Sequence, residues 1–352
     1  MKEGVEIVKA SIVGASGYSG LELIRLLLSH PEVEINTIVS PSNAGTNVHD
    51  VFPHLTNIQV SQFEALDAEK LASESDVIFF ATPAGVSSQS VPSLLNMGVP
   101  MIDLSGDFRL KNGDLYEKWY NHSSPPEGAL TEAVYGLSEY YSEDIKSANL
   151  IANPGCYPTA TLLGILPIIQ KGWADPSSLI IDGKSGLSGA GRKTSLTAHY
   201  SEVNENVSAY KLGKHQHIPE IEQVISNQIG ENVNVSFSTH LVPLTRGMMC
   251  SMYVNLSHDR SEAEVIDLYQ SIYEDHPFIR VMPEGKCPST KGVSGSNYCD
   301  IGLSVDPRTN RLTIISVIDN LMKGAAGQAV QNMNLRFGYP ETAGLSLSPV
   351  FP

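Results

Sequence analysis

The sequence predicts an α/β fold of two domains, a doubly wound parallel sheet followed by a mixed α+β domain. Its 352 residues are about twice the usual ~150-residue domain. In the first 150 residues, short apolar runs alternate with helical patterns, which is typical of a doubly wound sheet. After residue 151 the strand-like stretches become longer and lie closer together, which indicates a different second domain.

The elements of the first domain follow in order. A buried strand is expected at 9–13, a glycine-rich turn at 14–20 and a helix at 20–30, with Leu21, Ile24, Leu27 and Leu28 on one face. Further strands are expected at 33–39, 76–81 and 101–104, and a helix at 84–97. The run at 76–81 (Asp-Val-Ile-Phe-Phe-Ala) is typical of a parallel strand covered on both faces.

The second domain is predicted from longer strands and two intervening helices. Strands are expected at 179–182, 233–244, 248–256, 299–305 and 312–319, and helices at 219–229 and 262–273. The tail at 323–337 is helical again and ends at Gly338 and Pro340.

Composition excludes several classes of protein. The net charge of −15 repels nucleic acid and anionic lipid, so neither is an expected partner. No apolar run reaches the ~18 residues that span a bilayer, and the N-terminus lacks the pattern of a signal peptide. The four cysteines, at 156, 250, 287 and 299, form no disulfide framework and no paired metal-ligand spacing. A reduced cytoplasmic protein without a bound metal is expected.

The glycine-rich turn between the first strand and the first helix predicts a dinucleotide site. Small residues let the backbone approach a pyrophosphate, and the helix N-terminus supplies free N–H groups. The spacing is G-x-x-G-x-x-G, and a turn that merely suits helix–strand packing is the alternative. The residues predicted to bind the cofactor here are Gly14, Ser16, Gly17, Tyr18, Ser19 and Gly20.

The end of the second strand favours NADP over NAD. An NAD-binding chain usually carries a carboxylate there to bind the ribose 2′-hydroxyl, whereas this chain reads Val-Ser-Pro-Ser-Asn at 39–43. Ser40 could donate to a 2′-phosphate. Thr82 and Pro83, which follow the strand at 76–81, are further predicted cofactor contacts.

Cys156 is the predicted nucleophile. It follows Asn-Pro-Gly and precedes a helical pattern, and a helix N-terminus stabilises a thiolate and lowers the pKa of the thiol. A buried, inert Cys is the alternative, and it is the interpretation adopted for Cys250, which lies in an apolar run.

His215 and His217 form the second candidate site. Two His at this spacing point the same way in an extended segment and could ligate a metal, but one pair without established Cys or carboxylate partners is weak evidence for a metal site. Pro219 suits a first helical turn, so His217 is predicted beside a helix N-terminus that keeps its ring neutral and able to accept a proton.

Basic residues in an otherwise acidic chain predict anion binding. The loop at 184–193 is rich in Gly and Ser and has basic ends, so it is a candidate anion or cofactor site, with a flexible loop as the alternative. Arg109 follows a sheet strand, where open α/β sheets bind ligands, and Arg can grip a carboxylate or phosphate with two hydrogen bonds. Together with His215, the predicted substrate-binding residues are Arg109, Asn153, Ser185 and Arg192, with Lys193 as a further candidate, and Gly189 is a predicted cofactor contact.

The stretch Ile-Ala-Asn-Pro-Gly-Cys-Tyr-Pro-Thr-Ala-Thr-Leu-Leu-Gly-Ile-Leu-Pro at 151–167 resembles the active-site signature of the N-acetyl-gamma-glutamyl-phosphate reductases. The segments at 14–20, 103–110, 185–192, 215–221 and 319–331 are similar to that family in the same order. The glycine turn and the Asn-Leu-x-Lys-Gly-Ala-Ala-Gly stretch are shared more loosely with aspartate-semialdehyde dehydrogenases.

The resemblance implies NADPH-dependent reduction of N-acetylglutamyl 5-phosphate to the 5-semialdehyde, in arginine biosynthesis, through a thioester on Cys156. It implies a Rossmann-type NADP-binding domain at 1–152 and 322–352, and a glyceraldehyde-3-phosphate-dehydrogenase-like catalytic domain at 153–321 that mediates assembly into a homodimer or homotetramer. His217 falls at the family's acid–base histidine, although the division of roles with His215 stays open. Asn320 falls where related enzymes hold the nicotinamide end.

Other functions remain to be distinguished. A related reductase could act on a carrier-linked aminoadipyl phosphate or on aspartyl phosphate. A cysteine hydrolase could also pair Cys156 with His217, but it would not need the dinucleotide turn. A catalytically silent NADP-binding regulator would lack a reactive thiol.

Overall fold

The computed structural model describes residues 7–56 and 62–351, and the chain divides into two compact units. Unit 1 comprises residues 1–154 and 325–346, and unit 2 comprises residues 155–324 and 347–352. The predicted α/β fold class is confirmed. The end of the chain belongs to unit 2, where the Val350 N–H donates to the Ser294 carbonyl at 2.8 Å.

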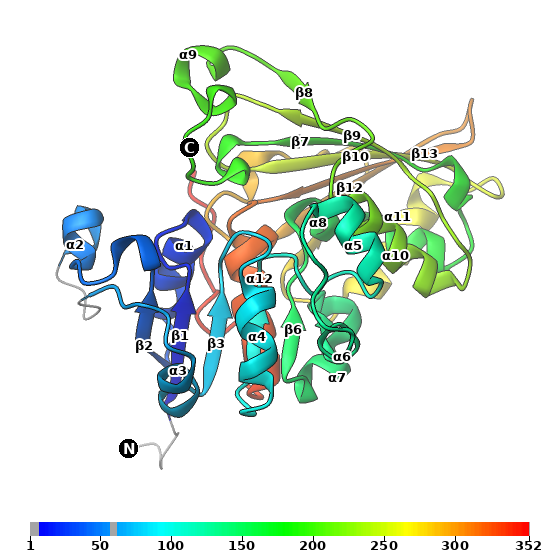
Figure 1. The fold of residues 1–352 in the computed structure, drawn as a ribbon. Helices are drawn as coiled ribbons and strands as arrows, with labels where there is room; N and C mark the ends of the chain where they lie inside the picture. Colours follow the sequence, from blue (N-terminus) through cyan, green and yellow to red (C-terminus); the bar gives the residue numbers. More distant parts are fainter. Residues whose placement is uncertain (1–6, 57–61, 352) are drawn as a thin grey trace, which may run out of the picture. The chain divides into compact units, whose positions relative to one another are not determined.

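Unit 1 contains a six-stranded sheet in the order β2-β1-β3-β4-β6-β5 (Figure 1). Every strand pair in it is parallel. The strands are β1 (Val8–Val13), β2 (Val33–Val39), β3 (Val77–Phe80), β4 (Met101–Asp103), β5 (Val134–Tyr135) and β6 (Leu150–Ala152). The order runs outward from β1 in both directions, so the sheet is doubly wound as predicted.

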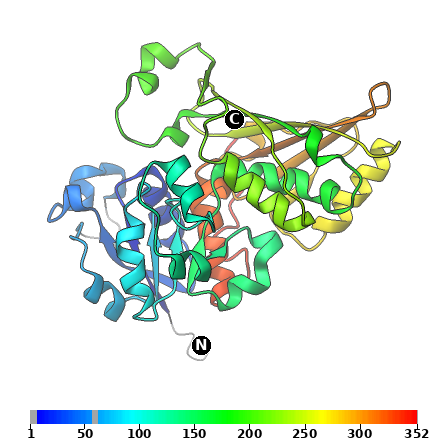
Figure 2. The same cartoon turned by 45° about the vertical axis from the view of Figure 1, so that its right-hand side comes forward.

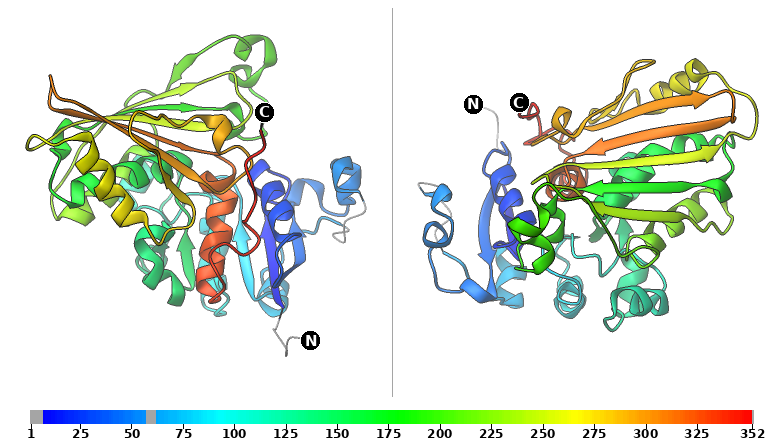
Figure 3. Two further views of the ribbon diagram at one scale, coloured as in Figure 1. Left: turned by 180° about the vertical axis from the view of Figure 1, so that it is seen from behind. Right: turned by 90° about the horizontal axis from the view of Figure 1, so that it is seen from above.

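Helices cover both faces of this sheet. The helices of unit 1 are α1 (Tyr18–Leu27), α2 (Val48–Val51), α3 (Ala68–Glu74), α4 (Ser87–Leu95), α5 (Gly113–Tyr120), α6 (Glu127–Glu132), α7 (Ser138–Ser147) and α12 (Gly327–Arg336), of which the short α2 lies beyond the β2 edge (Figure 1). The α4 helix lies on one face and α1 and α12 lie on the other, as the front and back views show (Figures 1 and 3). The C-terminal helix α12 contacts α1, α7 and β4, so it completes unit 1.

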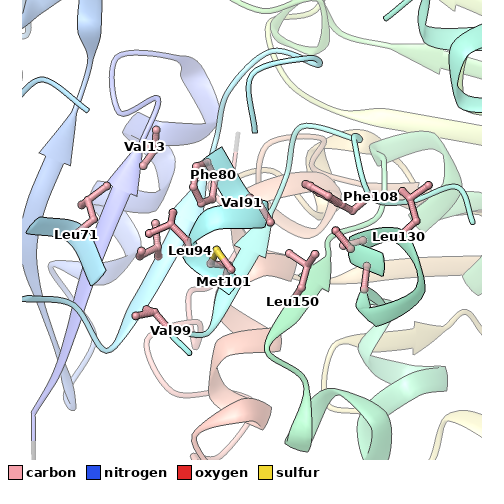
Figure 4. Packing of buried hydrophobic residues seen from close by; sticks show 14 of the residues in the cluster. Val13, Leu71, Phe80, Val91, Leu94, Val99, Met101, Phe108, Leu130 and Leu150 are labelled. Atoms are coloured by element: carbon pink, nitrogen blue, oxygen red, sulfur yellow. The ribbon is translucent and has the colours of Figure 1, made fainter. Parts of the chain in front are cut away.

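One core of unit 1 lies between the sheet and the helices that include α3, α4 and α6 (Figure 4). Phe80 from β3, Leu94 from α4 and Leu150 from β6 are among its fully buried members. On the opposite face, α1 buries the predicted Ile24 and Leu27 and also Leu23 and Leu26, whereas Leu28, its C-cap residue, is exposed, so the predicted apolar face of this helix was partly wrong. The buried face is different because α1 contacts α12 as well as β1 and β2.

Unit 2 contains a seven-stranded mixed sheet in the order β11-β12-β13-β10-β7-β9-β8. The strands are β7 (Ile180–Ser185), β8 (Ser208–Tyr210), β9 (Ser236–Leu241), β10 (Met248–Asn255), β11 (Ile279–Val281), β12 (Cys299–Asp306) and β13 (Arg311–Ile318). β7 pairs parallel with β9, and β11 with β12, while the other pairs are antiparallel. The strand predicted at 233–244 is shorter, because the chain turns where the Leu244 N–H donates to the Val242 carbonyl.

Three long helices cover the same face of this sheet, namely α8 (Cys156–Gln170), α10 (Ile218–Ile229) and α11 (Glu262–Tyr273) (Figure 2). A fourth, short helix, α9 (Tyr200–Val203), lies near β8 (Figure 1). Leu162, Leu163 and Ile165 of α8 are fully buried, and α8 packs on β10 and β13. Within residues 7–56 and 62–351, every helix is too short or too polar to cross a bilayer.

Candidate active site

Cys156 is the first residue of α8, as predicted from the sequence. Gly155 is the N-cap residue, with extended backbone angles (φ −66°, ψ 155°). The carbonyl of Gly155 accepts hydrogen bonds from Thr159, from its N–H at 2.9 Å and from its hydroxyl at 3.0 Å. The Cys156 side chain is a thiol rather than half of a disulfide, and it is partly accessible. It therefore lies in the positive field of a helix N-terminus, which favours a thiolate.

His217 is the N-cap residue of α10, and Pro219 stands in the first turn of that helix. Proline suits this position because its missing N–H would have no partner there. The His217 side chain is buried. Two helices that are far apart in the sequence therefore present these groups from their N-termini, the thiol from the first residue of α8 and the imidazole from the N-cap residue of α10.

The imidazole of His217 lies against Gly155. A Cβ atom on Gly155 would lie 2.4 Å from His217 Nε2, so a side chain at position 155 would collide with the ring. The structure thus brings His217 against the residue that precedes Cys156. This arrangement suits a base that exchanges a proton with the nucleophile.

A turn from the end of β13 closes the other side of Cys156. A Cβ atom on Gly324 would lie 2.9 Å from the Cβ of Cys156. Asp319 holds this turn, because its carbonyl accepts from the Gly324 N–H at 3.0 Å and its buried carboxylate accepts from the Leu321 N–H at 2.8 Å. The same carboxylate faces Arg246 Nη1 at 3.6 Å.

Arg246 is a candidate that the sequence analysis missed. It is partly exposed and pairs with the carboxylate of the turn that contacts Cys156. The signal that could have found it is a basic residue between the strands predicted at 233–244 and 248–256 of an acidic chain.

His215 is neutral and has a supporting position. Burial, with a smaller effect of Lys211, lowers its pKa to about 3. Its Nδ1 accepts the backbone N–H of His217 at 3.2 Å, so this nitrogen carries no proton. The ring packs edge-on against Tyr157, with the ring centroids 5.5 Å apart. Its contact with substrate stays a prediction, and its hydrogen bond to the His217 backbone holds the start of α10.

The predicted loop at 184–193 is organised by Asn320. The Asn320 side chain donates to the hydroxyl of Ser188 at 2.8 Å and accepts from the Gly247 N–H at 2.8 Å. Ser185 is buried, and its hydroxyl donates to the carbonyl of Gly186. Gly189 and Arg192 are exposed at the far end of the loop. The assignments of these residues to substrate or cofactor stay predictions.

The predicted dinucleotide turn of unit 1 has the expected backbone. Gly14 has φ +89°, and a Cβ atom there would lie 2.4 Å from the carbonyl oxygen of Ala81. A Cβ atom on Gly20 would lie 2.4 Å from the Gly14 carbonyl, so α1 starts in direct contact with the turn. Gly17 is the N-cap residue of α1 and has no side-chain cap. This helix N-terminus therefore keeps backbone N–H groups for an anion.

Two of the serines predicted to bind cofactor, Ser16 and Ser40, lie together. The hydroxyl oxygens of Ser16 and Ser40 are 2.8 Å apart, and Asn43 Nδ2 donates to Ser40 Oγ at 3.0 Å. Tyr18 and Ser19 are the first residues of α1. The absence of a carboxylate from residues 40–43 fits a phosphorylated ribose.

Arg109 and Asn153 are engaged inside unit 1. Arg109 Nε donates to the Asn153 carbonyl at 2.7 Å, and Nη2 donates to the Leu104 carbonyl at 2.8 Å. The Asn153 amide donates to the Ala325 carbonyl and accepts from Asn332. Both residues are buried. These bonds hold the ends of β4 and β6, and the predicted contacts with substrate stay predictions.

Asp107 fixes the segment that contains Thr82 and Pro83. Its buried carboxylate accepts from the Gly85 N–H at 2.8 Å and the Ser88 N–H at 3.0 Å, which anchors the start of α4. The neighbouring Asp103 is also fully buried, and burial, followed by the charge of Asp107, raises its pKa to about 6.

The metal interpretation of the His pair finds no support. Across residues 7–56 and 62–351, no group of three or more His, Cys, Asp or Glu side chains could hold a metal ion.

Two family models match this chain, and known reductases are similar to it over nearly its whole length. Residues 9–148 match the semialdehyde dehydrogenase NAD binding domain, and residues 156–320 match the semialdehyde dehydrogenase dimerisation domain. The N-acetyl-gamma-glutamyl-phosphate reductase of Brevibacillus brevis is 53% identical over 346 residues, covering 98% of this chain and 100% of the relative. The enzyme of the same name from Geobacillus thermodenitrificans is 51% identical over 345 residues, covering 98% of this chain and 100% of the relative.

A solved structure supports the fold. Aspartate semialdehyde dehydrogenase II from Vibrio cholerae superposes with a TM-score of 0.72 at 17% identity, covering 95% of this chain and 99% of the other.

Gly17→Ala tests the dinucleotide turn. A Cβ atom at this position approaches no protein atom outside its neighbours closer than 3.5 Å, so we expect the fold to tolerate it at a cost of about 1 kcal/mol or less at the cap. The added methyl group would occupy the approach of the pyrophosphate, and we expect the Kd for NADPH to rise at least about tenfold. Fluorescence titration with NADPH and a thermal melt measure the two effects. Unchanged affinity would contradict the assignment.

Asp103→Asn tests the buried carboxyl. Its pKa is raised from 3.8 to about 6 in the folded state, so its stabilising contribution is present below pH 4 and is lost as the pH rises to 6. At about 1.4 kcal/mol per pKa unit, we expect the free energy of unfolding to fall by about 2–3 kcal/mol over this range. The variant should lose this decline in urea unfolding, whereas the exposed control Asp144→Asn should keep it. Equal pH dependence in both variants would refute the effect.

Proposed function

This chain belongs to the N-acetyl-gamma-glutamyl-phosphate reductase family, and we propose that it reduces N-acetyl-L-glutamyl 5-phosphate with NADPH to N-acetyl-L-glutamate 5-semialdehyde and phosphate. This is the reductive step of that acyl phosphate in arginine biosynthesis. The observation that carries the proposal is the His217 imidazole against Gly155, directly before Cys156 at the start of α8. Similarity to reductases of this name over 98% of the chain supports the substrate.

Cys156 begins the reaction. Its thiolate attacks the acyl carbon of the acyl phosphate, the carbon–oxygen bond to the phosphoryl group breaks, and inorganic phosphate leaves. The product is a thioester on Cys156. The N-terminus of α8 stabilises the thiolate, and its backbone N–H groups suit an acyl oxygen that becomes negative in the transition state.

His217 is the acid–base residue of this reaction. As a neutral imidazole it accepts the thiol proton, and as an imidazolium it donates a proton to the oxygen of the reduced thioester. The resulting thiohemiacetal collapses, which releases the aldehyde and restores the thiol. The backbone N–H of His217 is held by His215, which fixes the start of α10 through these steps.

The dinucleotide turn fits NADPH. The uncapped start of α1 would hold the pyrophosphate, and Ser16 and Ser40 would lie toward the 2′-phosphate, with no carboxylate at residues 40–43 to repel it. When bound, NADPH supplies the hydride that converts a thioester to a thiohemiacetal. A cysteine hydrolase would need no such turn.

The substrate is an anion, and the chain is acidic, so local positive charge is required. Arg246 is partly exposed beside the turn that contacts Cys156, and Arg192 and Lys193 are exposed on the loop at 184–193. We infer that these residues of unit 2 bind the carboxylate or the phosphate of the substrate. The net charge of −15 disfavours an acidic carrier protein as substrate.

A homodimer or homotetramer in the cytoplasm is part of this proposal. The match to a dimerisation domain supports assembly. Within the described residues, one face of the unit 2 sheet carries no helix (Figure 3). Leu196, Tyr200 and Val207 of the same unit are more than half exposed, which is typical of an interaction surface. All four cysteines are thiols, which fits a reducing compartment.

Phosphate-dependent reduction of NADP with N-acetylglutamate semialdehyde tests the proposal in the reverse direction. Cys156→Ser should remove this activity and leave NADPH affinity unchanged, and His217→Asn should lower kcat by about 10²–10⁴-fold. Cys287→Ser, at an exposed cysteine, is the matched control and should keep full activity.

Two results would overturn the assignment. Turnover by Cys156→Ser would exclude the thioester route, and a preference for aspartate semialdehyde would change the substrate. If His215→Asn abolished activity and His217→Asn did not, the roles of the two histidines would be reversed.

A further inference from the structure

Glu220 is a fully buried carboxylate that the proposed chemistry does not use. It lies in the first turn of α10, three residues after His217. Burial of a carboxylate is costly unless hydrogen bonds compensate it. Its Oε1 accepts the backbone N–H of Gly155 at 2.9 Å, so the carboxylate links the start of α10 to the N-cap residue of α8.

Gly155 contacts the N-terminal ends of both α8 and α10. Its N–H donates to Glu220, its carbonyl accepts from Thr159 of α8, and its Cα faces the His217 ring. A Cβ atom at Gly155 would lie 2.4 Å from His217 Nε2, so the ring occupies the space that a side chain at position 155 would need. Any shift of Gly155 relative to α10 therefore changes the spacing between the imidazole and the next residue, Cys156.

We propose that Glu220 is a positioning residue for the reaction. Its carboxylate fixes Gly155 and thereby holds the thiol of Cys156 and the imidazole of His217 in the correct position relative to each other. The inference rests on the proposed function, since it takes Cys156 and His217 as the reacting pair. Glu220 acts through the backbone of Gly155, so the acceptor oxygen and the reach of the side chain are the properties that count.

The same helix offers a matched control. Glu222 is half-buried on α10, and its Oε1 accepts the backbone N–H of Val235 at 3.0 Å. The bond is of the same kind and of similar length, but it holds the segment before β9. Glu222→Ala therefore removes a comparable carboxylate-to-backbone bond without touching Gly155.

The experiment compares four variants in the full-length protein, namely Glu220→Ala, Glu220→Gln, Glu220→Asp and Glu222→Ala. For each we measure kcat and KM, and the rate of iodoacetamide alkylation of Cys156 against pH in a Cys287→Ser background. The background removes the exposed thiol that would otherwise react. Thermal melts and NADPH titration verify folding.

We expect Glu220→Ala to lower kcat by about a hundredfold with little change in KM, because a misplacement of about 1 Å costs this much. The alkylation rate should fall, and its pH profile should change shape, because the thiol and the imidazole no longer share a proton in the same geometry. Glu220→Gln keeps an acceptor oxygen and should recover to within about tenfold of the wild type, whereas Glu220→Asp is one methylene too short and should not. Glu222→Ala should stay within about threefold of the wild type, as a bond remote from the reacting pair.

The opposite pattern would overturn the inference. If Glu220→Ala lowers only the melting temperature, as Glu222→Ala does, the bond is structural. If Glu220→Gln is as inactive as Glu220→Ala, the reaction depends on the negative charge of Glu220 and not on the position of Gly155 that its hydrogen bond fixes. If Glu220→Ala does not fold, the comparison of Glu220→Gln with Glu220→Asp decides between the two roles. Failure of the wild-type protein to reduce the acyl phosphate, with an alkylation profile that still depends on Glu220, would refute the proposed function alone.

Discussion

The approach of two helix N-termini at Gly155 is the constraint on which the site depends. A glycine is required there because His217 occupies the space of a side chain. Each N-terminus carries about half a positive charge, so α8 and α10 both direct positive potential toward this point, where they also offset the charge of the buried Glu220 carboxylate. This explains how a chain of net charge −15 can offer a thiolate and an anionic acyl group a favourable environment.

The two histidines of the pair have different surroundings. His215 is buried among aromatic rings, and burial lowers its pKa to about 3, so its ring is neutral near pH 7. Its Nδ1 is occupied by the His217 N–H. His217 instead has its ring against the residue before the nucleophile. These contacts support the proposed roles, with His217 as the acid–base residue and His215 as the residue that holds its backbone.

The predictions that were confirmed rested on short sequence patterns. The glycine turn, the Pro-Gly before Cys156 and the Pro after His217 each report on the few residues around them, and the structure has a helix beginning at each place. Short strands such as β5 and β8 escaped prediction because two or three residues show no period. Leu23 and Leu26 were left out of the predicted apolar face because the contact between α1 and α12 joins segments about 300 residues apart.

Long-range partners explain why the remaining site residues could not be predicted. Glu220 is unremarkable in sequence, since an acidic residue in a first helical turn is common, and only the fold brings Gly155 to it. Arg246 likewise gains its place from Asp319 on another strand end.

The case of Arg109 is the reverse. An Arg after a sheet strand predicts a ligand contact, yet its guanidinium grips the carbonyls of Leu104 and Asn153 at two neighbouring strand ends. Buried carbonyls at the ends of parallel strands need donors, and a buried Arg can satisfy several at once. Arg109 therefore satisfies backbone carbonyls at the ends of the strands, which is also where this class of fold binds its ligand.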